Sequence, residues 1–173
     1  MHPISAADPA LDARALSELL SSLADALMQR GWLMATAESC TGGLIAGACT
    51  ELPGSSRWFD RGFVTYSNAA KTEMLGVPAE LIAQHGAVSE EVACAMAQGA
   101  AQRACVQAAV AVTGVAGPDG GSLDKPVGTV WMAWHIAGHT HAQRVVFAGT
   151  RAQVRQQTVA HVLRHLLQQL SSA

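Results

Sequence analysis

The segment AAVAVTGV (108–115) constrains the fold more than any other stretch of the chain, because it is a near-continuous run of apolar residues. A strand of this kind is buried on both faces, as happens in parallel sheets that helices cover on either side. The segment therefore predicts a buried strand of an α/β sheet, and the rest of the chain should supply the other strands and the covering helices.

The remaining segments alternate between strand and helix patterns. Leucines recur at helical spacing over roughly residues 10–30, and Gly31 should end that helix. Further helices are predicted at 41–52, 68–75, 89–105 and the C-terminal segment, and further strands at 32–37, 61–67, 127–138 and 140–149, the last two as a hairpin around Gly138. This order predicts a three-layer α/β/α sandwich with a mixed, mostly parallel five-stranded sheet that contains one antiparallel strand.

The charge pattern narrows the class of partner. The net charge is −2 and no basic run occurs, which argues against nucleic acid as a partner, although the expected sheet is similar to that of anticodon-binding domains. Only 14% of the residues are charged, against roughly 25% in a typical soluble domain. We therefore expect a homodimer or a larger homo-oligomer, in which another copy of the chain covers apolar surface.

Neither a membrane span nor a secretory signal is expected. No stretch approaches ~18 consecutive apolar residues, and the N-terminal residues lack the basic and apolar regions of a signal peptide. The four cysteines form no C-x-x-C pair and are expected to be free thiols in a reducing cytosol. The sequence thus predicts a cytoplasmic chain with one domain, 1–173, of which residues 1–10 form a flexible tail.

Three polar loops follow predicted strands of the sheet, namely AESCTGG (37–43), TYSNAAK (65–71) and TGVAGPDGG (113–121). Sheets of this class bind ligands at the carboxyl ends of their strands, so the three loops are candidates for one shared site. The third loop matches neither the P-loop nor the dinucleotide fingerprint. For Gly114 and Gly117, a loose backbone nest for an anion and an ordinary turn both remain open.

The first loop offers three adjacent nucleophiles, Ser39, Cys40 and Thr41. The backbone amides of Thr41, Gly42 and Gly43 are expected at the start of the following helix. In that position they could stabilise an oxyanion or bind a phosphate group. The alternative is that the glycines only allow the helix to pack closely on the sheet.

Two residues could serve as the base for this nucleophile. A cysteine would need a histidine, and only His85 lies near a candidate loop. A serine can use a lysine instead, and Lys71 follows Ser39 by 32 residues, just after the next predicted strand. If Asn68 is the N-cap, Lys71 lies in the first helical turn, where the helix dipole and burial would lower its pKa. A solvated surface lysine is the alternative.

Other polar residues could complete the site. Tyr66, the only tyrosine, could orient Lys71 or relay a proton, and Thr113 could donate a hydrogen bond into the cleft, although either could instead serve packing or a turn. Arg151 and Arg155 lie in the first turns of the last helix, where a cation is unfavourable unless an anion is bound. We interpret Arg151 as the anion contact and Arg155 as an exposed residue. No ligand spacing predicts a metal site.

Five ordered blocks, TAESCTGG, GFVTYSNAAK, HGAVSEEVA, TGVAGPDGG and KPVGTVW, resemble the C-terminal domain of the CinA (competence/damage-inducible) proteins over about residues 12–170. That family includes stand-alone bacterial nicotinamide-nucleotide amidohydrolases, also called NMN deamidases. The resemblance implies hydrolysis of the carboxamide of nicotinamide mononucleotide, which yields nicotinate mononucleotide and ammonia. No cofactor and no metal are expected.

The resemblance also implies a Ser–Lys pair, which maps to Ser39 and Lys71, with Tyr66, Thr41 and Thr113 assisting. In the implied reaction, neutral Lys71 takes the proton of Ser39 while the serine oxygen attacks the amide carbonyl. The nearby backbone amides would hold the developing oxyanion.

The phosphate end of the substrate has its own expected contacts. Arg151 matches the arginine of the family's G-x-R block, and together with the amides of the glycine loop it would hold this phosphate. Two alternatives remain open, a thiol amidase that uses Cys40 and a non-catalytic nucleotide-binding or regulatory module.

Overall fold

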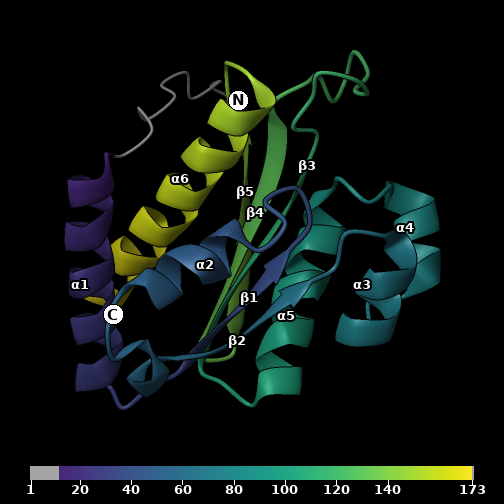
Figure 1. Ribbon diagram of the computed structural model, residues 1–173. Coiled ribbons are helices and arrows are strands. Elements are labelled where there is room, and N and C mark those ends of the chain that lie inside the picture. Colours follow the sequence, from purple (N-terminus) through teal and green to yellow (C-terminus); the bar gives the residue numbers. More distant parts are fainter. Residues whose placement is uncertain (1–11, 173) are drawn as a thin grey trace.

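The computed structural model describes residues 12–172, so the flexible tail expected at 1–10 lies outside the described residues. Within them, one five-stranded sheet lies between two layers of helices (Figure 1). The elements follow in the order α1 (Ala13–Gln29), β1 (Met34–Glu38), α2 (Leu44–Glu51), the 3₁₀ turn η1 (Ser55–Arg57), β2 (Phe59–Val64), α3 (Asn68–Leu75), α4 (Ala79–His85), α5 (Glu90–Ala104), β3 (Ala108–Gly114), β4 (Thr129–Ile136), β5 (His139–Val146) and α6 (Arg151–Ser172).

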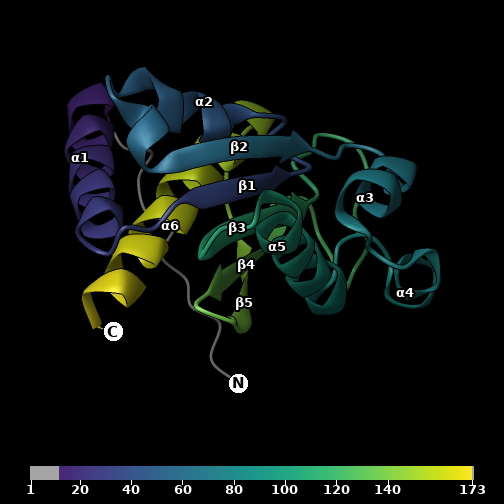
Figure 2. The same cartoon turned by 90° about the horizontal axis from the view of Figure 1, so that it is seen from below.

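The sheet has the strand order β2-β1-β3-β4-β5. β1 pairs in parallel with both β2 and β3, whereas β4 pairs antiparallel with β3 and with β5. One strand, β4, therefore runs against the other four, which confirms the predicted mixed sheet with a single antiparallel strand. The carboxyl ends of β1, β2 and β3 meet at one edge, and Figure 2 shows α3 and α4 beyond the end of β2 at that edge.

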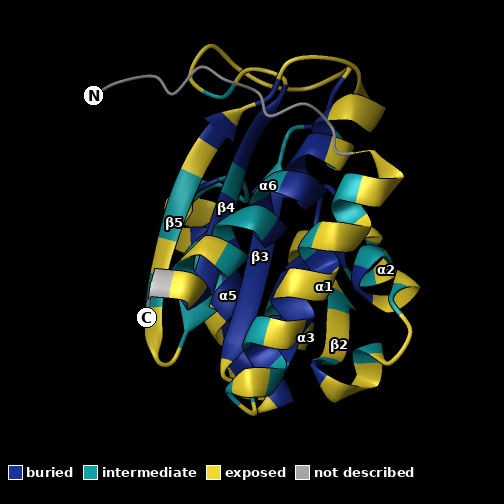
Figure 3. Ribbon diagram, turned by 90° about the vertical axis from the view of Figure 1, so that its left-hand side faces the viewer, coloured by how far each residue is buried: buried dark blue, intermediate teal, exposed yellow. Residues whose placement is uncertain are grey.

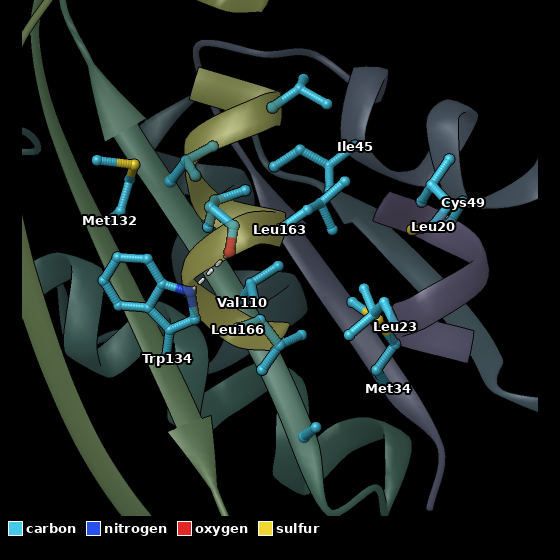
Figure 4. Close-up of a cluster of buried hydrophobic side chains, with 14 of the residues drawn as sticks. Leu20, Leu23, Met34, Ile45, Cys49, Val110, Met132, Trp134, Leu163 and Leu166 are labelled. Atoms are coloured by element: carbon cyan, nitrogen blue, oxygen red, sulfur yellow. Dashed lines mark hydrogen bonds between the residues drawn. The ribbon is translucent and has the colours of Figure 1, made fainter. Parts of the chain in front are cut away.

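The two faces of the sheet are packed with side chains of different size. Toward α1, α2 and α6 the sheet presents large residues such as Met34, Val110, Met132 and Trp134 (Figure 4). Trp134 Nε1 also donates a hydrogen bond of 2.9 Å to the carbonyl oxygen of Val162 in α6. Figure 3 shows β3 and the inner side of α6 as buried, which is why the strand at 108–115 contains almost no polar residue.

The buried centre of the opposite face is lined by alanine. The side chains that pack here against α5 come from β1, β3 and β4, namely Ala35, Ala37, Ala109, Ala111 and Ala133. The buried side of α5 is itself rich in alanine, so the helix lies close to the sheet. α3 and α4 pack in turn against α5. This packing positions α3, which carries the candidate catalytic residue Lys71.

Helix boundaries differ in detail from the sequence prediction. Ser89 caps α5 as expected, since its Oγ accepts a hydrogen bond from the amide of Val92. The cap of α3 is Ser67 rather than the predicted Asn68, because Ser67 is extended and its Oγ accepts from the amide of Ala70 at 3.0 Å. Asn68 is already helical, so Lys71 becomes the fourth residue of α3 and stays within its first turn.

The prediction also missed one helix and placed two boundaries wrongly. The segment 79–85 forms α4, which the sequence analysis did not identify. α2 begins at Leu44, because residues 41–43 form a turn that leads into the helix. The strand predicted at 61–67 ends at Val64, which leaves the polar residues that follow free to form a connection between β2 and α3.

Candidate active site

Ser39 is the first residue after β1 and is held at the carboxyl edge of the sheet. Its amide donates a hydrogen bond of 3.1 Å to the carbonyl oxygen of Val112 in β3, so parallel pairing continues one residue past the strand. The side chain is 8% exposed, and it lines a cavity. Ser39 is therefore fixed by its backbone, while its hydroxyl remains accessible from the cavity.

Lys71 reaches the same point from α3. Its Nζ lies 3.1 Å from Ser39 Oγ, 3.0 Å from the carbonyl oxygen of Thr65 and 3.5 Å from the carbonyl oxygen of Tyr66. The side chain is only 1% exposed. Within residues 12–172, no carboxylate lies at ion-pair distance from this amine. Two residues 32 positions apart in the chain thus share a hydrogen bond, as the sequence predicted.

Burial lowers the pKa of Lys71 from its usual value of 10.5, because the ammonium form would lose its hydration in the interior. A neutral amine has two N–H groups and one lone pair. The carbonyl oxygens of Thr65 and Tyr66 can accept the two N–H groups, which leaves the lone pair for the hydroxyl of Ser39. The contacts of Lys71 therefore suit a general base that acts on Ser39.

Cys40 also lines the cavity, but its surroundings oppose thiolate chemistry. Burial is the main reason that the pKa of the Cys40 thiol rises to about 11, and the charge of Glu38 acts in the same direction. His85, the only histidine near a candidate loop, lies 3.1 Å from a carboxylate oxygen of Glu91, and no histidine lines the cavity. A thiol at this position lacks the base that would activate it.

The cavity itself has a volume of about 180 Å³. Pockets that enclose a whole drug-sized ligand usually measure roughly 300–1,000 Å³, so this cavity fits only part of a nucleotide. The residues that line it are Ser39, Cys40, Tyr66, Asn68, Lys71, Ala87, Val88, Thr113, Gly114, Ala116 and Arg151. All three polar loops thus contribute to one cavity, as their places after the strands predicted.

Arg151, Tyr66 and Gly117 form a second group at the mouth of this site. Arg151 donates one hydrogen bond of 3.1 Å to Tyr66 Oη and another of 2.9 Å to the carbonyl oxygen of Gly117. The hydroxyl of Tyr66 is thus engaged with Arg151, and the contact of Tyr66 with Lys71 is made by its backbone. Thr113 donates its hydroxyl to the carbonyl oxygen of Ala87 at 2.8 Å.

The glycine amides of the first loop are not free, contrary to the sequence prediction. The amide of Gly42 donates to the carbonyl oxygen of Ser39 at 3.1 Å, and that of Gly43 donates to Glu38 Oε2 at 3.0 Å. Thr41 is fully buried, with its hydroxyl 2.7 Å from the same carboxylate oxygen. Neither glycine nor Thr41 lines the cavity, and Glu38 accepts hydrogen bonds from the donors at the start of α2.

Glu38 is the functional candidate that the sequence analysis missed. It is fully buried at the end of β1, and its oxygens accept hydrogen bonds from five donors around the turn. The only sequence signal for these hydrogen bonds is the position of Glu38 shortly before a helix start, where a carboxylate is favourable.

Arg155 also departs from its prediction as an exposed residue. It is partly buried, and its Nη2 donates a hydrogen bond of 2.9 Å to the carbonyl oxygen of Thr41. Its Nε is buried without a hydrogen-bond partner among the described residues. One turn of α6 therefore separates the arginine at the cavity, Arg151, from an arginine that contacts the Ser39 loop from outside.

Two further observations apply to residues 12–172 alone. No group of three or more His, Cys, Asp and Glu side chains is arranged there to hold a metal ion. No helix in this part of the chain combines the length and the apolar character that crossing a membrane requires.

The sequence of the chain matches the family model of the CinA C-terminal domain over residues 16–170. The chain therefore belongs to the CinA C-terminal domain family, which confirms the resemblance of the five sequence blocks.

Curated relatives cover nearly the whole chain. It is 52% identical over 155 residues to nicotinamide-nucleotide amidohydrolase PncC of Escherichia coli (strain K12), which is 89% of this chain and 94% of the relative. It is 53% identical over 153 residues to the protein of the same name from Pseudomonas putida, covering 88% of this chain and 96% of the relative.

Solved structures of the same superfamily share the fold. The competence damage-inducible protein A (ComA) of Klebsiella pneumoniae superposes with a TM-score of 0.87 at 42% identity, covering 90% of this chain and 97% of that one. The competence/damage inducible protein CihA of Agrobacterium tumefaciens gives a TM-score of 0.86 at 46% identity, covering 90% and 95%. These neighbours confirm the predicted α/β fold class.

Proposed function

We propose that this chain hydrolyses the carboxamide of nicotinamide mononucleotide to nicotinate mononucleotide and ammonia, with Ser39 as nucleophile and Lys71 as general base. The observation that carries the proposal is the 3.1 Å contact between a buried lysine amine without a carboxylate partner and a serine hydroxyl that faces a cavity. The names of the relatives supply the substrate, since PncC is a nicotinamide-nucleotide amidohydrolase. Those names also confirm the expectation of an enzyme.

The first half of the reaction forms an acyl-enzyme. Ser39 Oγ attacks the carbonyl carbon of the carboxamide while its proton moves to Lys71 Nζ. The carbon–nitrogen bond then breaks, and Lys71 returns the proton to the leaving nitrogen, so that ammonia departs and an ester with Ser39 remains. In the second half, water attacks the ester with Lys71 again as base, which releases the carboxylate and restores both side chains.

The oxyanion of each step needs backbone donors near Ser39. The amides of Gly42 and Gly43 are already engaged, whereas those of Cys40 and Thr41 form no backbone hydrogen bond within residues 12–172. Of these two residues only Cys40 lines the cavity, so we assign the oxyanion to the amide of Cys40; the loss of one such donor typically costs about 3 kcal/mol of transition-state stabilisation.

The rest of the nucleotide extends toward Arg151. This guanidinium lines the cavity at the start of α6, where the helix dipole also favours an anion. Arg151, the residues of the glycine-rich loop and Tyr66 would hold the ribose phosphate, while the small cavity encloses the reacting carboxamide.

The test compares ammonia release from nicotinamide mononucleotide by the wild type, Ser39→Ala and Lys71→Met. We expect each variant to lose roughly 10³-fold or more in kcat, as happens when one member of a nucleophile–base pair is removed. Lys125 is the only other lysine of the chain and does not line the cavity, so Lys125→Met is the matched control. Full activity of either Ser39→Ala or Lys71→Met would refute the proposed mechanism.

A second measurement identifies the nucleophile directly. Trypsin should release residues 31–57 as one peptide, which holds Ser39, Cys40 and Thr41 together. An acyl adduct trapped by acid quench should be located to Ser39 by fragmentation of this peptide. An adduct on Cys40 would support the thiol amidase instead, and binding of the nucleotide without ammonia release would support a non-catalytic module.

A further inference from the structure

Glu38 has no part in the reaction as proposed, yet it is one of the most heavily hydrogen-bonded side chains of the structure. Its Oε2 accepts from the hydroxyl of Thr41 at 2.7 Å and from the amides of Gly43 and Ile45, each at 3.0 Å. Its Oε1 accepts from the amide of Ala46 at 2.8 Å and from a second hydroxyl, that of Thr36, at 3.3 Å. The carboxylate is fully buried and does not line the cavity.

These contacts enclose the nucleophile within a closed turn. The backbone leaves β1 at Glu38, passes through Ser39 and returns to the same carboxylate at Gly43, Ile45 and Ala46. The backbone of Ser39 is fixed separately on the sheet side by its bond to Val112. The conformation of the turn is thus set by a side chain of the residue that immediately precedes the nucleophile.

We propose that Glu38 is a positioning residue for Ser39, because its carboxylate fixes the turn that holds the serine hydroxyl beside Lys71. In this arrangement Glu38 occupies the amides of Gly43, Ile45 and Ala46 at the start of α2, and the amide of Cys40 at the cavity is left for the oxyanion. The inference rests on the Ser39–Lys71 mechanism proposed above.

The five donors explain why an acceptor-only group is needed here. An ionised carboxylate offers two oxygens with about four lone-pair sites and no N–H group. A glutamine of the same size would replace one oxygen by an NH₂ group. That NH₂ group would face either the amide of Ala46 or the amides of Gly43 and Ile45, with no hydrogen bond possible between two donors. The turn would have to open at one side.

A positioning role also predicts that Glu38 takes no part in proton transfer. Its oxygens are satisfied by the turn, and the residue lies outside the wall of the cavity, so it exchanges no proton with a substrate. The pH dependence of kcat should consequently be unchanged when Glu38 is replaced. A residue that merely stabilised the fold would lower the amount of folded enzyme without altering kcat per folded molecule.

The experiment compares Glu38→Gln with Glu51→Gln, the same substitution at the exposed last residue of α2, the helix whose first amides bind Glu38. The assay measures kcat, KM and the pH profile of kcat at a temperature where circular dichroism shows each protein to be fully folded. For Glu38→Gln we expect kcat to fall roughly 10- to 100-fold, with KM within about twofold and the acid limb of the profile unmoved. Glu51→Gln should match the wild type.

Unchanged kcat in folded Glu38→Gln would overturn the inference, and so would loss of the acid limb, which would make Glu38 a proton-transfer group. If Glu38→Gln does not fold, Thr41→Val removes a single donor to the carboxylate and should lower kcat several-fold at constant KM; full activity there would also overturn the inference.

An active Ser39→Ala would instead refute the proposed mechanism. An inactive Ser39→Ala beside a fully active Glu38→Gln would refute only the role of Glu38.

Discussion

A single buried lysine dominates the chemistry of the site at the level of residues. Lys71 is 1% exposed, and its three polar contacts are a hydroxyl and two backbone carbonyl oxygens. A buried ammonium without a counter-ion is costly, so the interior shifts the lysine toward its neutral form. The same desolvation that penalises the charged lysine thereby favours the neutral amine that the proposed mechanism requires beside Ser39.

The lowered pKa of Lys71 predicts the pH dependence of the reaction. In the proposed mechanism the neutral amine is the active form, so kcat/KM should be low at acid pH, rise as the pH passes the lowered pKa of Lys71 and level off below 10.5. A rate profile for ammonia release between pH 5 and pH 10 measures this rise. A profile that still climbs tenfold per pH unit up to 10.5 would show an unperturbed lysine and contradict the prediction.

Thermal unfolding checks the same pKa without reference to activity. Below the pKa of folded Lys71 both states bind the proton; between that pKa and the unfolded value of 10.5, the unfolded state binds more protons. The stability of the wild type relative to Lys71→Met should therefore rise with pH across this window and stay flat below it.

Cys40 should be dispensable for turnover. Its thiol pKa of about 11 leaves almost no thiolate at neutral pH, and the cavity holds no histidine to act as its base. We expect Cys40→Ala to retain kcat within about threefold, with a modest loss of thermal stability because a buried side chain is truncated. A 10³-fold loss of ammonia release in this variant, with normal folding, would establish the thiol as nucleophile.

At the level of elements, the position of Lys71 depends on how closely α3 approaches α5. Gly99 in α5 lies against the end of α3, where an added Cβ would come within 2.2 Å of the carbonyl oxygen of Leu75. Leu75 is the last residue of the helix that carries Lys71. A side chain at position 99 would therefore push the end of α3 away from α5 and displace Lys71 relative to Ser39.

We expect Gly99→Ala to destabilise the protein by about 1–3 kcal/mol and to lower kcat as well, because the clash is with backbone and α3 must shift. Gly47→Ala in α2 is the matched control, since nothing lies within 4 Å of its Cβ position. That control should be neutral or stabilising by about 0.5–1 kcal/mol. Thermal unfolding and ammonia release measure both effects; a Gly99→Ala protein as stable and active as the control would contradict the packing argument.

The sequence predicted most elements, but it could not resolve their ends. The strand at 108–115 and the helix at 89–105 were identifiable because burial on both faces and a serine cap leave clear patterns. α4 has only seven residues, too few for a helical period to stand out, and was missed. The choice between Ser67 and Asn68 as cap could not be made from sequence, because both residue types cap helices well.

Prediction of the site succeeded where it depended on strand topology and failed where it depended on side-chain conformation. The proximity of Ser39 and Lys71 followed from parallel strands whose carboxyl ends share one edge. The hydrogen bonds of the glycine amides could not be predicted in this way. The bond from Gly43 to Glu38 depends on the conformation of the Glu38 side chain, which no periodicity in the sequence encodes. The inward position of Arg155 likewise depends on how α6 lies against the Ser39 loop.

At the level of the whole molecule, the low content of charged residues predicts that the chain forms a homo-oligomer. Only 14% of residues are charged, and several large hydrophobic side chains are exposed along α2, β2, α3 and the connection between β2 and α3, namely Leu44 (39%), Val64 (46%), Tyr66 (63%) and Met74 (41%). We expect light scattering after gel filtration to give a mass at least twice the 18.0 kDa of one chain. Because the covered surface would be apolar, 0.5 M salt should not dissociate the assembly. A mass of one chain at micromolar concentration would contradict the prediction.

The pairing of β1 with β2 sets how far the chain may vary in length. Val64 lies opposite Glu38, and the amide of Thr65 donates to the carbonyl oxygen of Glu38 at 2.8 Å, so the count of residues from this bond to Lys71 is fixed. One inserted residue between positions 64 and 71 would rotate or displace the amine away from Ser39. An insertion at Gly138, in the β4–β5 hairpin with open space around it, changes no such count. We therefore expect an insertion at Gly138 to leave ammonia release unchanged. An insertion between Val64 and Lys71 should abolish it.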